Sequence, residues 1–325
     1  MLDSLLDNRK AKINLYENFW LSQPRWSVMK LHQLQALVGA VDHGSIRAAA
    51  RALHLTQAAL TKSLRQLEED AGVALLVRKS RGVVLTETGL RLHTRARLVM
   101  RQLQLAQDEL RQSLGDQTGA VRVGLTPYLM LTVLGESFRW FRKRYPRVEL
   151  RLMEGLVTRV LPALRDGSLD FAIVASSGEV AAQEFEATRL GQAAQTLVVR
   201  VGHPVLNHPT AQQLRELEWV LPGPMAVEPD EGVAAMFAQA GVAPPELISR
   251  CDAMAAMALV RQSGAVSVMP APLLAQPEAH GLVGLALHNL QPPPVELILL
   301  APPDVPLAPA AAYLARCLTD AIHGH

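Results

Sequence analysis

The chain has 325 residues, of which 49% are hydrophobic and 19% are charged, and its formal net charge is +2. This composition excludes an intrinsically disordered protein, and the length allows two or three globular domains of about 100 to 150 residues each. The two cysteines, Cys251 and Cys317, form no CxxC or Cys/His pattern, which argues against a disulfide framework or structural zinc and suits a reducing cytoplasm.

Nothing in the sequence predicts contact with a membrane. No run approaches the about 18 to 20 consecutive apolar residues of a membrane span. Residues 1–28 also lack the apolar core and small-residue cleavage site of a signal peptide. We therefore expect a cytoplasmic protein.

Residues 30–89 predict a compact helical unit with two short helices joined by a tight turn. Ser45 is suited to cap the first helix, and after a break at His54–Leu55, Thr56 can cap the second. One face of the second helix is apolar, and the other is short, polar and cationic. The apolar face holds Leu60, Leu64 and Leu67, and the outer face holds Gln57, Thr61, Lys62 and Arg65.

A helix that enters the major groove of DNA needs this division between its two faces. Its apolar side packs against neighbouring helices, while amide, hydroxyl and cationic groups reach base edges and phosphates. The alternative is an ordinary amphipathic helix whose polar face is only solvated.

The next stretch, residues 75–86, favours the DNA-binding interpretation because it predicts a β-hairpin. Two β-prone runs flank a turn that contains Gly82, and Arg78, Lys79 and Arg81 crowd its tip. Arginine at the tip of a two-stranded wing is suited to contact phosphates or a narrow minor groove.

Together these motifs resemble the winged helix-turn-helix of the LysR-type transcriptional regulators. The matching motifs are Gly44-Ser45 with the Ala48-Ala49-Ala50 run, Thr56-Gln57-Ala58-Ala59-Leu60, Leu67-Glu68-Glu69, Leu75-Leu76-Val77-Arg78 and Arg81-Gly82 through Thr88-Gly89. Two positions depart from the family pattern: Ala58 stands where the family usually has proline, and the Leu76-Val77 pair replaces the usual phenylalanine before the wing arginine. Because alanine is an excellent helix former, we expect the geometry to survive.

The resemblance implies a DNA-binding domain over residues 29–90 that contacts double-stranded DNA. The residues expected at the DNA are Ser45, Gln57, Ala58, Thr61, Lys62 and Arg65 in the major groove, with Arg78 and Arg81 on the wing. Since the resemblance begins at Met29, we expect either that the natural chain starts there or that residues 1–28 form a poorly anchored arm.

Charge is distributed unevenly along the chain. Residues 29–116 contain 13 basic and 8 acidic residues, a net charge of +5, whereas residues 117–325 contain 15 and 19, a net charge of −4. The basic excess therefore lies in the part expected to bind phosphates.

A long helix is predicted after Gly89, over residues 91–117. Its apolar positions alternate steps of four and three residues, which is a heptad seam; they are Leu92, Ala96, Val99, Leu103, Ala106 and Leu110. The seam indicates a partner helix, with packing against its own domain as the alternative. The family resemblance implies a homodimer through this linker helix, further assembly to a homotetramer, and a partly palindromic DNA site.

Residues 118–325 alternate predicted strands and helices, which indicates α/β lobes with parallel strands and crossover helices. Strands are expected at 121–125, 148–153, 169–175, 196–201, 219–221, 247–250, 265–269 and 295–300, and helices at 129–144, 158–166, from 211, 233–240, 252–262 and 308–322. This half resembles the family's effector-binding region, built like a periplasmic binding protein. The implied lobes are residues 118–190 with 291–325, and residues 191–290. The expected fold class is thus α+β and multidomain.

Strand ends indicate where a ligand would bind, because ligands of open α/β sheets lie beyond the carboxyl ends of the strands. The candidates are Thr126, Pro127, Tyr128, Ser176, Pro222, Met225 and Met269. Hydroxyl groups and helix amino termini at these places favour a small, partly apolar organic acid as the effector.

We find no motif for a nucleotide, a catalytic zinc ion or a serine nucleophile, and we expect no metal or other cofactor. The predicted function is ligand-responsive transcriptional regulation. The alternatives are a small-ligand-binding protein or a cleft enzyme without a DNA function.

Overall fold

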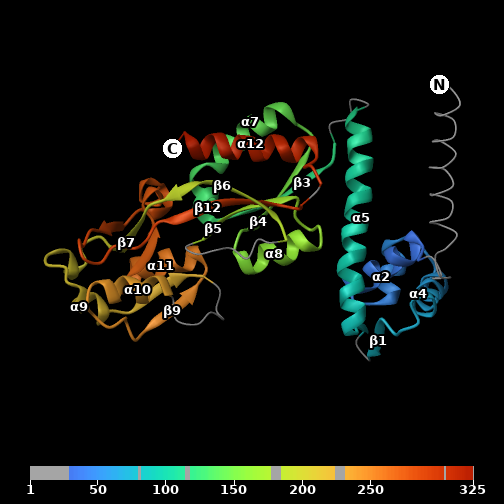
Figure 1. Ribbon diagram of the computed structural model, residues 1–325, viewed down its shortest axis with the longest axis horizontal. Coiled ribbons are helices and arrows are strands. Elements are labelled where there is room, and N and C mark those ends of the chain that lie inside the picture. The colour runs from blue at the N-terminus through green and yellow to red at the C-terminus, as the bar shows by residue number, and fades with distance from the viewer. Residues whose placement is uncertain are drawn as a thin grey trace, which may run out of the picture. The chain divides into compact units, whose positions relative to one another are not determined.

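The computed structural model describes residues 29–79, 82–113, 118–176, 184–223, 231–303 and 305–324. The chain divides into two compact units, residues 1–100 and residues 101–325, and the division falls within helix α5 (Glu87–Ser113) (Figure 1). Among the helices of the described ranges, none is long and apolar enough to cross a membrane.

The first unit consists of three helices and a hairpin. The helices are α2 (Leu31–Asp42), α3 (Ile46–Ala52) and α4 (Gln57–Ala71), and the hairpin pairs β1 (Leu76–Lys79) with β2 (Gly82–Leu85) in antiparallel register. The predicted pair of helices and the predicted wing are both confirmed.

Hydroxyl groups cap α3 and α4 where the sequence predicts. Ser45 Oγ accepts a hydrogen bond from the backbone amide of Ala48 at 3.2 Å, and Thr56 Oγ1 accepts one from Ala59 at 3.1 Å. Helix α4 ends at Gly72, whose φ of 66° lies in the left-handed region that glycine adopts without steric cost. Local sequence thus fixes both ends of α4.

The core of the first unit lies between its helices. Leu60, Leu64 and Leu67, the predicted inner face of α4, are at most 5% exposed and pack with Leu37 of α2 and Ala49 of α3. Burying three leucines on one side of α4 leaves its other side for solvent or a partner.

A carboxylate ties the end of α4 to the start of the hairpin. Glu68 Oε1 accepts hydrogen bonds from the backbone amides of Leu75 at 2.8 Å and Leu76 at 3.0 Å. Because these amides precede or begin the hairpin, Glu68 sets how the hairpin leaves the helix.

The predicted seam of α5 is not uniform. Ala96 is 1% exposed and Leu92 packs against the core of the first unit, so this part of the seam serves its own domain. Val99, Leu103 and Leu110 are 47%, 37% and 67% exposed. The prediction that the whole seam faces a partner helix is therefore wrong for its first two positions.

The second unit contains two lobes, and the first is organised by a five-stranded sheet in the order β4-β3-β5-β12-β6. Its strands are β3 (Ala120–Leu125), β4 (Glu149–Glu154), β5 (Phe171–Ser176), β6 (Glu186–Ala193) and β12 (Val295–Ala301). Strand β3 is parallel to β4 and β5, whereas β12 is antiparallel to β5 and β6. The lobe therefore combines residues from both ends of the unit.

Helices cover both faces of this sheet (Figure 1). Helices α7 (Leu134–Arg144) and α12 (Pro309–His323) pack on one face through residues such as Phe141 and Leu314. Helix α8 (Val157–Arg165) packs on the other. A short helix, α6 (Pro127–Thr132), follows β3.

The second lobe is formed by the segment between β6 and β12. Its strands are β7 (Gln195–Arg200), β8 (Trp219–Pro222), β9 (Ile248–Cys251), β10 (Ser267–Pro270) and β11 (Leu282–Leu285). Strands β10 and β11 flank β7 in antiparallel pairs, and β8 and β9 form a parallel pair. Its elements also include the helices α9 (Ala211–Arg215), α10 (Glu231–Gln239) and α11 (Ala253–Ser263) and the 3-10 turns Pro204–Leu206, Ala271–Ala275 and Pro277–Ala279.

Two sequence-based expectations for the second unit need correction, and one strand was not predicted. The helix predicted over residues 129–144 is two helices, α6 and α7, because Val133 ends one and precedes the other. Parallel strands with crossover helices were expected, but β7 and β12 pair with their neighbours in antiparallel register. Strand β6 was not predicted from the sequence, because most of it is exposed and only Leu190 and Ala193 are buried, so no apolar alternation marks it.

The contacts of Glu68 give a first testable prediction. Glu68→Ala leaves two backbone amides without their acceptor, so we expect local unfolding at residues 75–76 to become easier by about 1–3 kcal/mol. Hydrogen exchange of the full chain, followed by mass spectrometry, should show faster exchange there. Glu69→Ala is the control, since the described contact of Glu69 is an exposed ion pair with Arg65; equal exchange in both variants would contradict the assignment.

Candidate functional site

The outward face of α4 presents the predicted DNA-contacting side chains. Gln57, Ala58, Lys62 and Arg65 are exposed, and Thr61 is half-buried. Arg65 lies 3.6 Å from Glu69 in an ion pair between two exposed side chains, a weak contact that a phosphate could replace. The structure therefore brings these five residues onto the solvent side of one helix.

Ser45 caps α3 and is also one of the predicted DNA-binding residues. It is half-buried and its oxygen caps α3, but a hydroxyl that accepts from an amide still has its own proton to donate. On the wing, Arg81 and the side chain of Arg78 lie outside the described residues, so their predicted phosphate contacts stay predictions.

Two basic side chains of α3 were not among the predicted contacts. Arg47 and Arg51 are exposed and stand one helical turn apart. Neither forms an ion pair with any residue in the described ranges. Their i, i+4 spacing was the available signal, since it places two cations on the same side of the helix that precedes α4.

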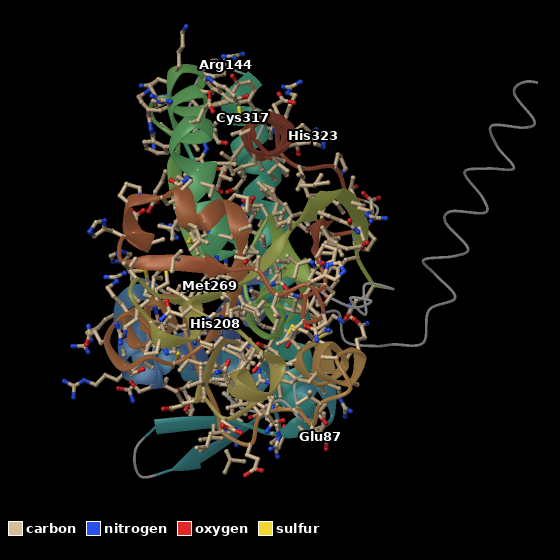
Figure 2. All side chains as sticks on the ribbon, turned by 90° about the vertical axis from the view of Figure 1, so that its left-hand side faces the viewer. Glu87, Arg144, His208, Met269, Cys317 and His323 are labelled. Atoms are coloured by element: carbon tan, nitrogen blue, oxygen red, sulfur yellow. The ribbon has the colours of Figure 1, made fainter. Side chains whose placement is uncertain are left out.

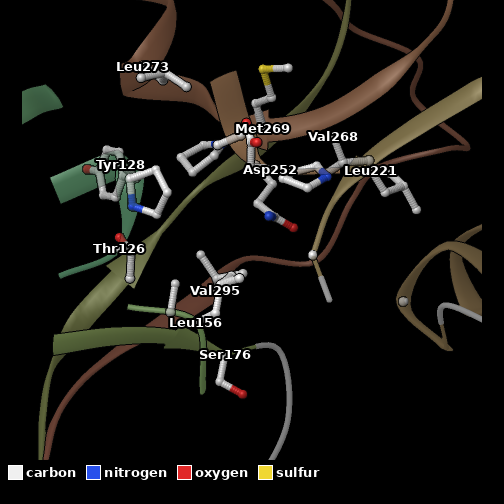
Figure 3. Close-up of a pocket in the computed structure, with 18 of the residues that line it drawn as sticks. Thr126, Tyr128, Leu156, Ser176, Leu221, Asp252, Val268, Met269, Leu273 and Val295 are labelled. Atoms are coloured by element: carbon white, nitrogen blue, oxygen red, sulfur yellow. The ribbon is translucent and has the colours of Figure 1, made fainter. Parts of the chain in front are cut away.

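The second unit contains a cavity of about 690 Å³ to which both lobes contribute (Figure 3). Polar and glycine residues of its lining are Thr126, Tyr128, Glu154, Gly155, Thr158, Ser176, Gln195, Gly223, Gly232, Arg250 and Asp252; apolar ones are Pro127, Leu131, Leu156, Val157, Ala175, Leu221, Pro222, Val233, Met236, Ala253, Met257, Val268, Met269, Pro270, Leu273, Pro292, Pro293 and Val295.

Six of the seven predicted ligand-binding residues meet in this cavity. They are Thr126, Pro127, Tyr128, Ser176, Pro222 and Met269. The seventh, Met225, lies outside the described residues. The rule that a ligand site lies beyond the carboxyl ends of strands thus located the cavity from sequence.

Thr126 and Tyr128 begin the first wall of the cavity. Thr126 is 5% exposed and its hydroxyl oxygen accepts a hydrogen bond from the Leu129 amide at 3.4 Å, capping α6. Burial raises the pKa of the Tyr128 phenol above its ordinary value, so this side chain stays protonated and can donate a hydrogen bond.

Gly155 lines the cavity on the same side, at a position where a side chain would clash with the backbone. A Cβ atom at this position would lie 2.6 Å from the backbone carbon of Leu125 and 2.9 Å from the amide nitrogen of Thr126. Only glycine permits this approach of the end of β4 to the end of β3. Residues 154–158 were not among the predicted ligand-binding residues, although they too lie between a strand and a helix.

Charged side chains also line the cavity, and none of them was among the predicted ligand-binding residues. Glu154 ends β4 and lies 3.8 Å from Arg159. Arg250 and Asp252 flank Cys251 at the end of β9, and Asp252 Oδ1 caps α11 by accepting from the Ala255 amide at 2.8 Å. The cavity is thus mainly apolar, with a few charges at its strand ends.

Two family models match the chain. The model described as "Bacterial regulatory helix-turn-helix protein, lysR family" matches residues 31–90, and the one described as "LysR substrate binding domain" matches residues 114–322. The second match alone covers more than half of the chain.

Among individual relatives, the HTH-type transcriptional regulator TdcA of Escherichia coli K12 is 30% identical over 193 residues, which are 59% of this chain and 62% of TdcA. The match thus spans less than two thirds of that relative.

Two solved structures share the fold. Full-length CbnR complexed with its target DNA has a TM-score of 0.64 at 22% identity, covering 90% of this chain and 100% of CbnR. ArgP from Mycobacterium tuberculosis has a TM-score of 0.68 at 20% identity, covering 90% and 97%.

Cys251, next to the cavity residues Arg250 and Asp252, gives the second prediction. Burial and the neighbouring Asp252 carboxylate raise the pKa of the Cys251 thiol above its ordinary value of 9.0. Because the thiolate is the nucleophile, iodoacetamide should alkylate Cys251 more slowly than free cysteine at pH 7.5, and the rate should still be rising above pH 9. Mass spectrometry of the labelled Cys251 peptide measures this; a rate equal to that of free cysteine would contradict it.

Proposed function

Because the chain belongs to the LysR family of bacterial regulators, we propose that it is a DNA-binding transcriptional regulator whose promoter binding responds to a small molecule in the cavity. The name of TdcA and the DNA-bound structure of CbnR support the DNA-binding part of this proposal. The cavity between the two lobes, within the stretch matched by the substrate-binding family model, supports the ligand-binding part.

The observation that carries the proposal is the division of α4 into two faces. Leu60, Leu64 and Leu67 hold its inner side in the core, and Thr56 fixes its first turn. Its outer side therefore presents amide, hydroxyl and cationic groups in a rigid arrangement, which is what reading base edges in a major groove requires.

Within this proposal, each group on the DNA-binding surface has a role. The Gln57 amide reads a base edge, Ser45 and Thr61 donate hydrogen bonds, and Lys62 and Arg65 pair with phosphates or guanine. Ala58 allows close approach of the helix backbone. Arg78 and Arg81 contact the phosphates or minor groove from the wing, and Arg47 and Arg51 add phosphate contacts.

We also propose that the protein acts as a homodimer through α5 and as a tetramer through its lobes. The exposed seam residues Val99, Leu103 and Leu110 support the dimer, because a row of exposed apolar side chains on one helix gains stability from a partner helix. Two linked DNA readers would recognise a partly palindromic site.

For the cavity we propose a binding role and not a catalytic one, since the matched relatives are named as regulators. The effector is an organic acid, and it shifts DNA binding by its different affinity for two arrangements of the lobes. A protein with this task works in the cytoplasm, where the DNA is.

Substitutions on α4 test the DNA-binding role. Gln57→Ala should cost about 1–3 kcal/mol on a selected operator and relax the base preference at one position. Arg65→Ala should weaken binding to all sequences and lower the salt dependence by about one phosphate contact. Fluorescence anisotropy with duplexes selected from a random pool measures both effects.

Arg165→Ala is the matched control, because Arg165 is an exposed arginine of the second unit that pairs with Glu184. Equal affinity of the Gln57→Ala and unaltered proteins would remove Gln57 from the surface. Failure of the unaltered protein to bind any duplex would favour a ligand-binding protein without a DNA function.

The dimer proposal predicts that a charge on the seam separates the subunits. Leu110→Glu should raise the dimer dissociation constant by at least about tenfold without unfolding the chain, because Leu110 is largely exposed in the single chain. Analytical ultracentrifugation measures this. Leu90→Glu is the control, because Leu90 is a leucine of α5 off the seam that is 55% exposed, against 67% for Leu110; an unchanged dimer in Leu110→Glu would exclude this seam as the interface.

A further inference from the structure

The charges that line the cavity are unequal in number. Among the described lining residues, Arg250 is the one basic side chain, whereas Glu154 and Asp252 both carry carboxylates. Residues 177–183 and 224–230, which follow the lining residues Ser176 and Gly223 in the sequence, lie outside the described ranges; they contain no lysine, arginine or histidine but three acidic residues, Glu179, Glu228 and Asp230. Those stretches therefore cannot add a cation to the cavity wherever they lie.

Arg250 lines the cavity from the end of strand β9. Strand β9 places it opposite Leu221 of β8, and its Nη1 atom lies 3.4 Å from the point where a Cβ atom of residue 223 would stand. Since residue 223 is glycine, the guanidinium group lies over bare backbone at the carboxyl end of β8. A planar cation there can bind one carboxylate or sulfonate through paired hydrogen bonds.

The two carboxylates repel an anionic ligand, whereas Arg250 attracts one. Glu154 comes from the first lobe and Asp252 from the second, so negative charge lines both sides of the cavity. Like charges repel more strongly in a cavity that excludes water than in bulk solvent. Arg159 lies 3.8 Å from Glu154, but it is largely exposed and does not line the cavity. A ligand with a second anionic group would therefore meet this repulsion with no second lining cation to offset it.

The rest of the lining favours an apolar ligand body. Leu221, Met236, Met257, Met269 and Leu273 are almost fully buried and border the cavity. Methionine side chains adapt to different apolar shapes, and the volume of about 690 Å³ fits a small organic molecule.

We propose that the cavity selects a small monoanion with an apolar body, whose anionic group pairs with Arg250, and that Glu154 and Asp252 reject dianions. This assignment deepens the proposed function, since it rests on the cavity being the effector site. It makes Arg250 the residue that sets the preference for acids and the two carboxylates the residues that limit it to one charge.

Two matched series of compounds test the charge rule on the full chain. One is 3-phenylpropanoate, 3-phenylpropanamide and phenylsuccinate, and the other is hexanoate, hexanamide and adipate. By isothermal titration calorimetry the monoacid of at least one series should bind about tenfold or more tightly than its amide and its diacid. Equal or tighter binding of the diacid, or no binding by any of the six compounds, would overturn the proposal.

Variants assign the preference to the named side chains. Arg250→Gln should abolish the preference for the monoacid over the amide, while Arg261→Gln, a change at an exposed arginine of the same lobe outside the lining, should keep it. The double variant Glu154→Gln, Asp252→Asn should raise the affinity for the diacid relative to the monoacid by about tenfold, and asparagine can still cap α11. Unchanged ratios in these variants would also overturn the assignment.

The test separates this inference from the proposed function. Binding of selected duplex DNA is measured on the same proteins without any acid. Loss of DNA binding with the charge rule intact would overturn the regulator and keep the ligand class, whereas the reverse result would keep the regulator and discard the ligand class.

Discussion

Strand β12 enters the first sheet from near the end of the chain and lies between β5 and β6. The pairing of Val295 with Ala193 is the constraint on which the second unit depends, because it joins the first residue of β12 to the last residue of β6. The chain leaves for the second lobe directly after Ala193 and returns directly before Val295. Both connections between the lobes therefore start side by side, at one place on the sheet.

This arrangement explains where the cavity lies and how the proposed response to a ligand would reach both lobes. Ser176 and Val295 line it from the first sheet, and Leu221 and Met269 line it from the second lobe (Figure 3). Two adjacent connections form a natural hinge, since few backbone angles must change for the lobes to move apart or together. A ligand that contacts both lobes then stabilises one arrangement by the difference between its affinities for the two.

Sequence reasoning succeeded where short-range physics decides the structure. Ser45 and Thr56 cap helices because their hydroxyl groups satisfy amides three residues away, and strand ends located the cavity because α/β topology brings those ends together. It failed where contacts between residues far apart in the sequence determine the structure. Strand β6 is fixed by its pairing with β12, about a hundred residues away, and Leu92 of α5 packs against the core of the first unit.

The charged residues of the cavity are a second case in which contacts between distant residues decide the structure. In the sequence, nothing distinguishes three of these residues from ordinary surface charges: Glu154, Arg250 and Asp252. Only the fold of the two lobes brings them together around one apolar cavity. Figure 2 shows side-chain nitrogen and oxygen atoms over much of the protein, so a polar or charged side chain alone does not mark a site. What distinguishes these three is that an apolar lining surrounds them.

Strand β5 connects this cavity to the start of the second unit. Its last residue, Ser176, lines the cavity, and Asp170, directly before its first residue, is a buried carboxylate that pairs with Arg101 of α5 and accepts from the Arg122 amide at 2.9 Å. Separating a buried ion pair costs several kcal/mol, so the pair fixes α5 firmly to the start of β5. A change at the carboxyl end of β5 therefore reaches α5 through one strand of about six residues, which is stiff because β3 and β12 flank it on both sides. In the proposed function, this short path is the route by which a ligand in the cavity acts on α5.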